Sequence, residues 1–268
     1  MALGTVKLGS VEVSRLIVGG NPFSGFSHQT PDRDRDMRHW YTVERIKETL
    51  RKAAAAGITA HISRADHHVI RYLMEFWDEG GVLTWLAQTC PEVGSVMRGV
   101  ENAIGGGAKA CHLHGGMMDH LFAAGQLQEI PGAIARLKEA GLAAGIAGHN
   151  PAVFEWAEEN LDVDYYMCSY YNPQPRETHA EHIHGMTEDF NDRDRQVMTR
   201  AIAKLRRPVI HYKVLAAGRT PPREALAFVA QHLRAQDAVC VGVWMKDNPK
   251  SLEEDVKWLE EGLEKAGK

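Results

Sequence analysis

Two histidines, His112 and His114, end the short apolar run Ala110-Cys111-His112-Leu113, directly before a glycine pair. Side chains alternate between the two faces of a β-strand, so both histidines point one way while Cys111 and Leu113 point the other. Two imidazoles in a core would need partners for all their ring nitrogens, which is costly without a function. The pattern predicts the floor of an active site with His112 and His114 as catalytic residues. Hydrogen-bonded structural histidines are the alternative.

Ligands for a divalent metal are also available from different parts of the chain. His112, His114, His211 and Asp66 together offer the imidazole and carboxylate groups that suit Zn, Mn, Fe or Ni. A metal with an open position would polarise a carbonyl or activate water. The spacing matches no fixed metal motif, so the histidines could instead act singly as acids, bases or hydrogen-bonding groups. His68 belongs to the same set of candidate acids.

Lys213 is a candidate nucleophile because a desolvated lysine can form a Schiff base with a carbonyl substrate. The alternative is a lysine that pairs with a carboxylate or reaches solvent. Strand alternation places Tyr212 on one face and the pair His211 and Lys213 on the other. Tyr212 is likewise predicted as a catalytic residue, and the sequence leaves open which of these side chains faces a pocket.

The elements that must position these residues follow a repeated strand–helix order. Eight apolar runs, each followed by helical sequence, predict strands over 16–20, 58–62, 82–89, 109–114, 143–147, 164–169, 208–214 and 238–244. This alternation predicts an α/β fold, a (β/α)₈ TIM barrel formed by one domain over 1–268. A doubly wound sheet is the alternative, although no Gly-x-Gly-x-x-Gly follows a strand.

Two segments lie outside this repeat near the N-terminus. Residues 1–15 contain two short strands around a Gly-Ser turn and predict a hairpin. Residues 24–41, with alternating acidic and basic side chains, predict a long polar loop.

Polar residues gather at the predicted C-terminal strand ends, where a barrel of this kind carries its chemistry. The candidates for substrate binding at these ends are Asn21, Arg64, Asp66, Gln88, His149 and Tyr170. A long connection over 172–191 predicts a lid, whose Arg176 and His182 could also meet the substrate.

Three segments resemble the aldo-keto reductases, and the similarity spans nearly the whole chain. Leu8 to Leu16 is similar to that family's opening hairpin, and 212–219 is similar to its Tyr-Ser-Pro-Leu-x-x-Gly run after the seventh strand. The third segment, 248–255, resembles its Asn-Pro-x-x-Leu-x-Glu-Asn helix start. The resemblance implies a barrel whose bottom is closed by the hairpin. It also implies a nicotinamide cofactor, NADP, with Tyr212 stacked on the nicotinamide ring.

The catalytic pattern of the family is only partly matched. Ser63 replaces its Asp, His68 its Tyr and Gln88 its Lys, whereas His114 matches. Gly148, His149 and Cys168 occupy the positions that hold the cofactor carboxamide. The Arg that binds the adenosine phosphate has no counterpart near Ser251. The chain is therefore identified as an aldo-keto-reductase-like barrel turned to another reaction.

These observations predict a non-redox enzyme that acts on a small, polar, sugar-like or carbonyl substrate. The expected class is a lyase, isomerase or hydrolase that uses the histidine cluster, with a metal as a possible cofactor. One alternative is an NAD(P)H-dependent aldo-keto reductase in which His68 and His114 transfer the proton. A further alternative is a non-catalytic small-molecule binding protein.

The composition limits the partners and the compartment. A formal net charge of −4 gives no basic surface for nucleic acid. The sequence contains no stretch of 18 apolar residues and no secretory signal, so membrane partners are not expected. Four unpaired cysteines, Cys90, Cys111, Cys168 and Cys240, are typical of a reducing compartment, and the predicted location is the cytoplasm. The oligomeric state is not predicted.

Overall fold

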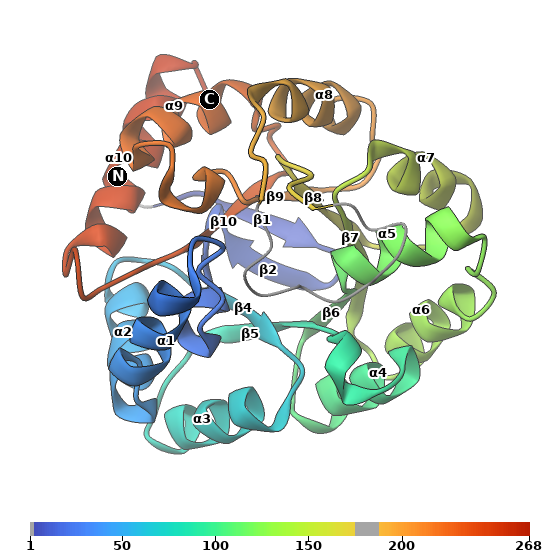
Figure 1. Ribbon diagram of the computed structural model, residues 1–268, viewed down its shortest axis with the longest axis horizontal. Coiled ribbons are helices and arrows are strands. Elements are labelled where there is room, and N and C mark those ends of the chain that lie inside the picture. The colour runs from blue at the N-terminus through green and yellow to red at the C-terminus, as the bar shows by residue number, and fades with distance from the viewer. Residues whose placement is uncertain (1–2, 175–187) are drawn as a thin grey trace.

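A closed barrel of parallel strands forms the centre of the computed structural model, which describes residues 3–174 and 188–268. The strands follow the order β10-β3-β4-β5-β6-β7-β8-β9 around the barrel, and helices surround them (Figure 1). The barrel strands are β3 (Leu16–Gly19), β4 (Ala60–Arg64), β5 (Thr84–Gln88), β6 (Ala110–Leu113), β7 (Ala143–Gly148), β8 (Tyr165–Ser169), β9 (Val209–Tyr212) and β10 (Ala238–Gly242). The predicted TIM-barrel fold is confirmed.

The outer layer consists of helices that follow the strands along the chain. These helices are α1 (Pro31–Trp40), α2 (Val43–Ala55), α3 (His67–Asp78), α4 (Val96–Gly105), α5 (Gly115–Ala124), α6 (Ile130–Glu139), α7 (Pro151–Asn160), α8 (Asp192–Ile202), α9 (Pro222–His232) and α10 (Ser251–Lys265). Parallel neighbours need such crossovers, because the chain must return to the start of the next strand.

Alternation along each strand divides the apolar residues into two cores. Ile62, Leu86 and Ala110 belong to a cluster inside the barrel, whereas Trp85 and Cys111 belong to the cluster between barrel and helices. The pairing of β5 with β6 sets Ala87 beside Cys111 and Gln88 beside His112. The direction of every side chain near the site follows from this alternation.

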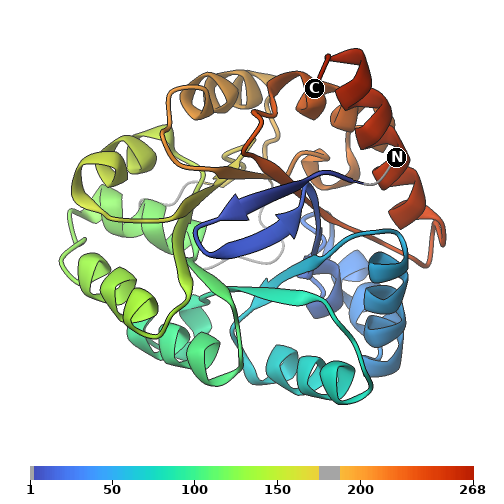
Figure 2. The ribbon, with the colours of Figure 1, turned by 180° about the vertical axis from the view of Figure 1, so that it is seen from behind.

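The hairpin of β1 (Thr5–Leu8) and β2 (Val11–Ser14) lies across one end of the barrel, as the resemblance implied (Figure 2). Val6, Leu8 and Val13 are buried in the cluster inside the barrel. The Ser14 amide donates to Thr59 Oγ1 at 2.7 Å, and the Thr59 amide donates to Ser14 Oγ at 3.0 Å. Apolar burial and these hydrogen bonds close the N-terminal end, so a cavity can open only at the other end.

The prediction of a loop over 24–41 is wrong for most of that segment, because α1 occupies residues 31–40. The Thr30 side chain accepts from the Arg33 amide at 3.1 Å, and Pro31 takes the first helical position, where its missing N–H costs nothing. Asp32 and Asp34 lie in the first turn, where the helix dipole favours acidic groups. The alternating charges concealed these helix signals.

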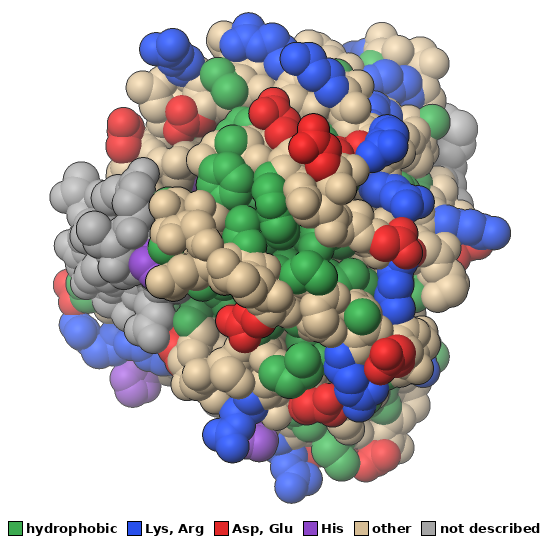
Figure 3. All heavy atoms as spheres, turned by 90° about the vertical axis from the view of Figure 1, so that its right-hand side faces the viewer, with side chains coloured by type: hydrophobic (Ala, Val, Ile, Leu, Met, Phe, Trp, Pro, Cys, Tyr) green, Lys and Arg blue, Asp and Glu red, His purple; other side chains and the backbone are tan. Residues whose placement is uncertain are grey.

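Hydrophobic side chains show between charged ones on the side of the molecule that carries α5, α6 and α7 (Figure 3). No helix among the described residues has the length and apolar character needed to cross a bilayer. The four cysteines are buried and unpaired, as expected from their apolar surroundings.

The hairpin should contribute to stability through Leu8, which is completely buried. We expect Leu8→Ala to lower the free energy of unfolding by about 2–5 kcal/mol, because it removes buried methyl groups and leaves a cavity. Lys7→Ala, at the exposed neighbouring position, is the control and should change it by no more than about 0.5 kcal/mol. Denaturant unfolding measures the free energy of unfolding of both variants. Equal changes in the two variants would show that burial of Leu8 in the barrel end does not stabilise the fold.

Candidate active site

A cavity of about 480 Å³ opens at the C-terminal ends of the barrel strands. Its wall includes Asn21 after β3, Arg64 at the end of β4 and Gln88 at the end of β5. Tyr212 contributes from β9 and Lys213 from the position after it, and the segment after β10 extends the wall towards α10. The cavity therefore occupies the end of the barrel where polar residues were expected.

The backbone at Lys213 settles which residues of β9 face the cavity. Lys213 has a φ of 57°, in the left-handed region that ordinary residues avoid. This turn interrupts the strand alternation, so that both Tyr212 and Lys213 line the cavity. His211 remains in the regular strand, is completely buried and faces the helices. Tyr212 and Lys213 therefore share one side, which regular alternation does not allow.

The loop that follows continues in the same unusual conformation. Ala216 and Ala217 have φ values of 47° and 55°, and both lack the freedom of glycine. Each non-glycine residue in this region costs about 1–2 kcal/mol. Such strain persists where the surrounding structure enforces it, and it often accompanies function. Ala217 lies on the cavity wall.

A chain of hydrogen bonds leads from Tyr212 to a buried carboxylate. Tyr212 Oη lies 3.2 Å from His149 Nε2, and His149 Nδ1 lies 2.7 Å from Asp119 Oδ2. The backbone amides of His149 and Asn150 also donate to Asp119, at 3.0 and 3.1 Å. The carboxylate accepts the Nδ1 proton, which leaves Nε2 as the acceptor for the Tyr212 hydroxyl. The arrangement can take up or return the phenolic proton.

Gly115 makes the close approach of these groups possible. A Cβ atom at this position would lie 2.9 Å from Tyr212 Oη and 3.2 Å from the Gly148 nitrogen. Gly115 begins α5, the helix that carries Asp119. The glycine pair after β6 therefore lets the helix approach the ends of β7 and β9.

A second polar group lies around Lys213. Its Nζ is 3.1 Å from His28 Nε2, and His28 Nδ1 is 2.9 Å from Glu188 Oε1. Asn21 Nδ2 is 3.5 Å from His28 Nε2, and His28 has a φ of 56°. Lys213 thus contacts an imidazole that a carboxylate holds in place.

The ends of β4 and β5 contribute a part of the wall that ion pairs hold together. Arg64 Nε lies 2.9 Å from Asp66 Oδ2, and Arg64 Nη2 lies 3.0 Å from Glu92 Oε2. Asp66 also caps α3 by accepting from the Val69 amide at 3.0 Å. Two carboxylates therefore hold Arg64 at the cavity, and the side chain of Asp66 serves the helix as well as the ion pair. Gln88 lies on the wall, as predicted.

The histidines from which the sequence analysis began do not form the cavity wall described here. His112 points into the barrel, where it is completely buried and its Nδ1 lies 3.1 Å from Tyr165 Oη. Burial lowers the pKa of His112 to about 3, so it stays neutral. His114 Nδ1 accepts from the Met117 amide at 3.3 Å and caps α5. His68 is exposed on α3, edge-on to Tyr72.

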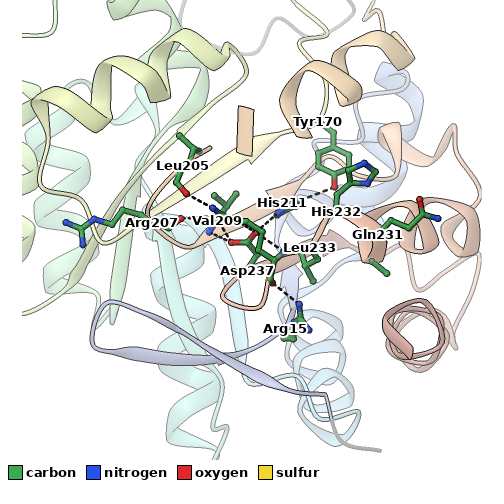
Figure 4. A network of polar contacts seen from close by, with 12 residues as sticks. Arg15, Tyr170, Leu205, Arg207, Val209, His211, Gln231, His232, Leu233 and Asp237 are labelled. Atoms are coloured by element: carbon green, nitrogen blue, oxygen red, sulfur yellow. Dashed lines mark hydrogen bonds and ion pairs between the residues drawn. The ribbon is translucent and has the colours of Figure 1, made fainter. Parts of the chain in front are cut away.

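The predicted metal ligands His112, His114, His211 and Asp66 do not share a site. His211 lies on the outer face of the barrel, where its Nε2 is 3.3 Å from Asp237 Oδ2 and its Nδ1 is 3.0 Å from Tyr170 Oη (Figure 4). Burial opposes ionisation of Asp237, but hydrogen bonds from His211 and Arg234 lower its pKa to about 2. The described parts of the chain contain no group of three or more His, Cys, Asp or Glu arranged around a metal.

Tyr170, expected to contact substrate, belongs to this second network instead. It is 1% exposed and packs edge-on against Phe228. Its place after the regular strand β8 directs it between barrel and helices.

Arg176 and His182 lie outside the described residues, as does most of the predicted lid over 172–191. Two described residues of that segment reach the site. Phe190 lines the cavity, and Glu188 contacts His28 and accepts from Gln174 at 3.0 Å.

Sequence reasoning missed Asp119 and His28. Asp119 lies within an expected helix, thirty residues before its partner His149, and only the glycine pair signalled an unusually close helix. His28 lies in the segment predicted as a polar loop. The fold brings both residues to the strand ends, and no local motif marks them.

The residues present do not fit the nicotinamide cofactor that the resemblance implies. Cys168, at the carboxamide position, is completely buried among the residues between barrel and helices. The cavity end near Ser251 carries Asp247 and Asp255, and Arg33 at this end is paired with Asp247 at 3.1 Å. Two carboxylates oppose a phosphate dianion there.

The fold can be compared with solved structures. No family model and no curated protein matches the sequence. The holo form of the aldo-keto reductase AKR11C1 from Bacillus halodurans is 12% identical, with a TM-score of 0.59 over 96% of this chain and 91% of that chain. Gox0644 in its apo form is 13% identical, with a TM-score of 0.62 over 99% and 94%.

A third neighbour of the same fold carries a different name. A truncated 3-deoxy-D-arabino-heptulosonate 7-phosphate synthase from Thermotoga maritima is 13% identical, with a TM-score of 0.56 over 99% of this chain and 93% of that chain. At these identities the similarity shows the fold alone. The chain has an aldo-keto-reductase-like (β/α)₈ barrel fold.

Gly115 offers a test of the close packing at the site. We expect Gly115→Ala to lower the free energy of unfolding by about 1–3 kcal/mol, because the added methyl group displaces Tyr212 or α5. Gly132→Ala is the matched control, since a Cβ in this α6 position meets nothing within 4 Å, and it should stabilise the protein by up to about 1 kcal/mol. Denaturant unfolding of both variants distinguishes them. A neutral Gly115→Ala would show that α5 moves without cost.

Proposed function

We propose that the protein is a non-redox enzyme that transfers protons on a small polar carbonyl or sugar-like substrate, as an isomerase or lyase. The observation that carries this proposal is the connection from Tyr212, on the cavity wall, through His149 to Asp119. An oriented imidazole beside a hydroxyl is the arrangement of general acid–base catalysis.

In the proposed mechanism Tyr212 exchanges a proton with the substrate. The Tyr212 hydroxyl passes its proton to Nε2 of His149, and the resulting phenolate removes a proton from the substrate. Asp119 holds the Nδ1 proton and stabilises the imidazolium that forms. The proton returns to another substrate atom by the reverse path, so no electrons are gained or lost.

The opposite group supports the same chemistry. Lys213 lines the cavity and lies 3.1 Å from His28 Nε2. An ammonium group at this position stabilises the negative charge that develops on a substrate oxygen when a neighbouring carbon loses its proton. Arg64 and Gln88 offer hydrogen bonds to the hydroxyl groups of a polar substrate. Tyr212 and Lys213 are thus the proposed catalytic residues, and His149 and Asp119 position the proton transfer.

An NADP-dependent reductase is the second candidate. This candidate is supported by Gox0644, which has the same fold. The structure of its D53A mutant in complex with NADPH matches this chain with a TM-score of 0.60. The acidic residues near Ser251 and the burial of Cys168 favour the first candidate. A non-catalytic binding role would leave the Asp119–His149–Tyr212 chain without a use.

Hydrogen–deuterium exchange tests the proposed proton transfer before the reaction is known. We expect the protein to catalyse exchange of carbon-bound hydrogen in at least one member of a panel of aldoses, ketoses and hydroxy-carbonyl acids in D₂O. Tyr212→Phe should slow this exchange by about 10²–10⁴-fold, because it removes the acid–base hydroxyl. Proton NMR of the substrate measures the rate.

The control is Tyr166→Phe, because the Tyr166 hydroxyl bonds to Glu158 outside the barrel. This variant should keep the exchange rate. Asp119→Asn should lower the exchange rate, because Asp119 positions His149. The substrate concentration at half-saturation should change much less, because the Asp119 side chain does not touch the substrate. Full exchange activity in Tyr212→Phe would contradict the proposal.

NADPH titration separates the two candidates. The two carboxylates near Ser251 should repel the phosphate, so we expect no saturable binding at low micromolar NADPH when protein fluorescence is followed. Saturation in that range, with oxidation of NADPH by an aldehyde, would establish the reductase instead.

A further inference from the structure

A carboxylate at the α10 end of the cavity has no partner within residues 3–174 and 188–268. Asp255 lines the cavity together with Ser251 and Trp258, which lie on the same face of the helix. Asp255 is only 3% exposed. Among the residues that the structure describes, no hydrogen-bond donor or cation lies within reach of its carboxylate. A buried ionised group without a partner is costly, so the position calls for a ligand.

The neighbouring charged groups differ from Asp255 because each has a partner. Arg33 pairs with Asp247 at 3.1 Å. Asn248 Nδ2 donates to Glu254 Oε2 at 2.7 Å, and Lys246 pairs with Asp36 at 2.6 Å. Arg33 and Lys246 are thus paired with other carboxylates, whereas the Asp255 carboxylate faces the cavity.

Two tryptophans complete the same part of the wall. Trp244 and Trp258 line the cavity, and the buried Nε1 of Trp244 has no acceptor among the described residues. The Trp244 ring already attracts cations, since Arg33 Cζ lies 5.7 Å and Lys246 Nζ 5.9 Å from its centroid. Aromatic faces beside a carboxylate suit an organic cation, which gains both ion pairing and cation–π attraction.

We propose that the Asp255 end of the cavity is a subsite for a cationic nitrogen group, an ammonium or amidinium, of a small organic ligand. Its N–H groups donate to the Asp255 carboxylate, and its carbon frame packs against Trp244 and Trp258. The Trp244 N–H then remains available to an oxygen of the same ligand. This subsite selects against anionic groups.

The ionisation of Asp255 supports this assignment. Burial, with a contribution from Glu254, raises the pKa of Asp255 to about 7. A bound cation favours the ionised carboxylate and supplies the counter-charge that the protein does not.

Binding of a cation at Asp255 does not depend on proton transfer at Tyr212. Only the assignment of the cationic group to the substrate rests on the proposed function. Cation binding and proton transfer are tested separately, because binding is measured without turnover.

The test compares cations with neutral molecules of the same shape at pH 8.5. We expect benzamidinium or benzylammonium to bind at least tenfold more tightly than benzamide or benzyl alcohol, with dissociation constants taken from NMR titrations of the full chain. Asp255→Asn should reduce the affinity for the cations to that of the neutral molecules. Its melting temperature should stay the same or rise, because the variant loses a buried charge.

Two further variants complete the experiment. Glu253→Gln is the matched control, because Glu253 lies in the first turn of the same helix but is exposed and does not line the cavity, and cation affinity should change less than twofold. Tyr212→Phe should bind the cations normally even where it abolishes exchange. Failure of both cations to bind, equal affinity for the neutral molecules, or unchanged cation binding in a folded Asp255→Asn would each overturn the proposal.

Discussion

Closure of the barrel by the pairing of β10 with β3 is the constraint on which the rest of the structure depends. Val239 lies beside Leu16 and Val241 beside Val18, so the last strand completes the ring begun by the first. Once the ring is closed, every strand residue faces either the sealed interior or the helices. The cavity is lined by inward-facing residues near the C-terminal strand ends, such as Ile62 and Tyr212, and by residues just beyond those ends. Lys213 joins them because its left-handed backbone interrupts the alternation, while His211 in the regular strand faces the helices.

The architecture could be predicted from the sequence because its signals are local and repeated. Apolar runs bounded by helical sequence reproduce the strands to within a few residues, and the Gly-Ser turn marks the hairpin. The site required information that no single segment holds. Both His112 and His211 lie in apolar strands, yet one faces the interior and the other the helices, and this depends on the register of each strand. His114 lies just beyond β6, where the chain turns into α5. The alternation of side chains along the strand therefore does not extend to His114.

The two proposed functional regions differ in how the protein treats charge. Around Tyr212, each polar group has a partner, and Asp119 alone accepts from the ring of His149 and from two backbone amides. Such a saturated network fixes the geometry that proton transfer requires. Around Asp255, the part of the chain that the structure describes offers no partner to the carboxylate on the cavity wall or to the buried indole N–H of Trp244. The first region is complete without a ligand, and the second is completed by one.

The hairpin across the barrel bottom has a kinetic consequence for any reaction in the cavity. Because β1 and β2 seal the N-terminal end with buried apolar side chains, the cavity is a blind chamber. Molecules therefore reach the cavity from the C-terminal side of the barrel, where Phe190 and the loop after β9 line it. A product that leaves on this side shares its route with the entering substrate, so accumulated product competes with fresh substrate for the cavity. Product release on that side then contributes to turnover together with the chemical step.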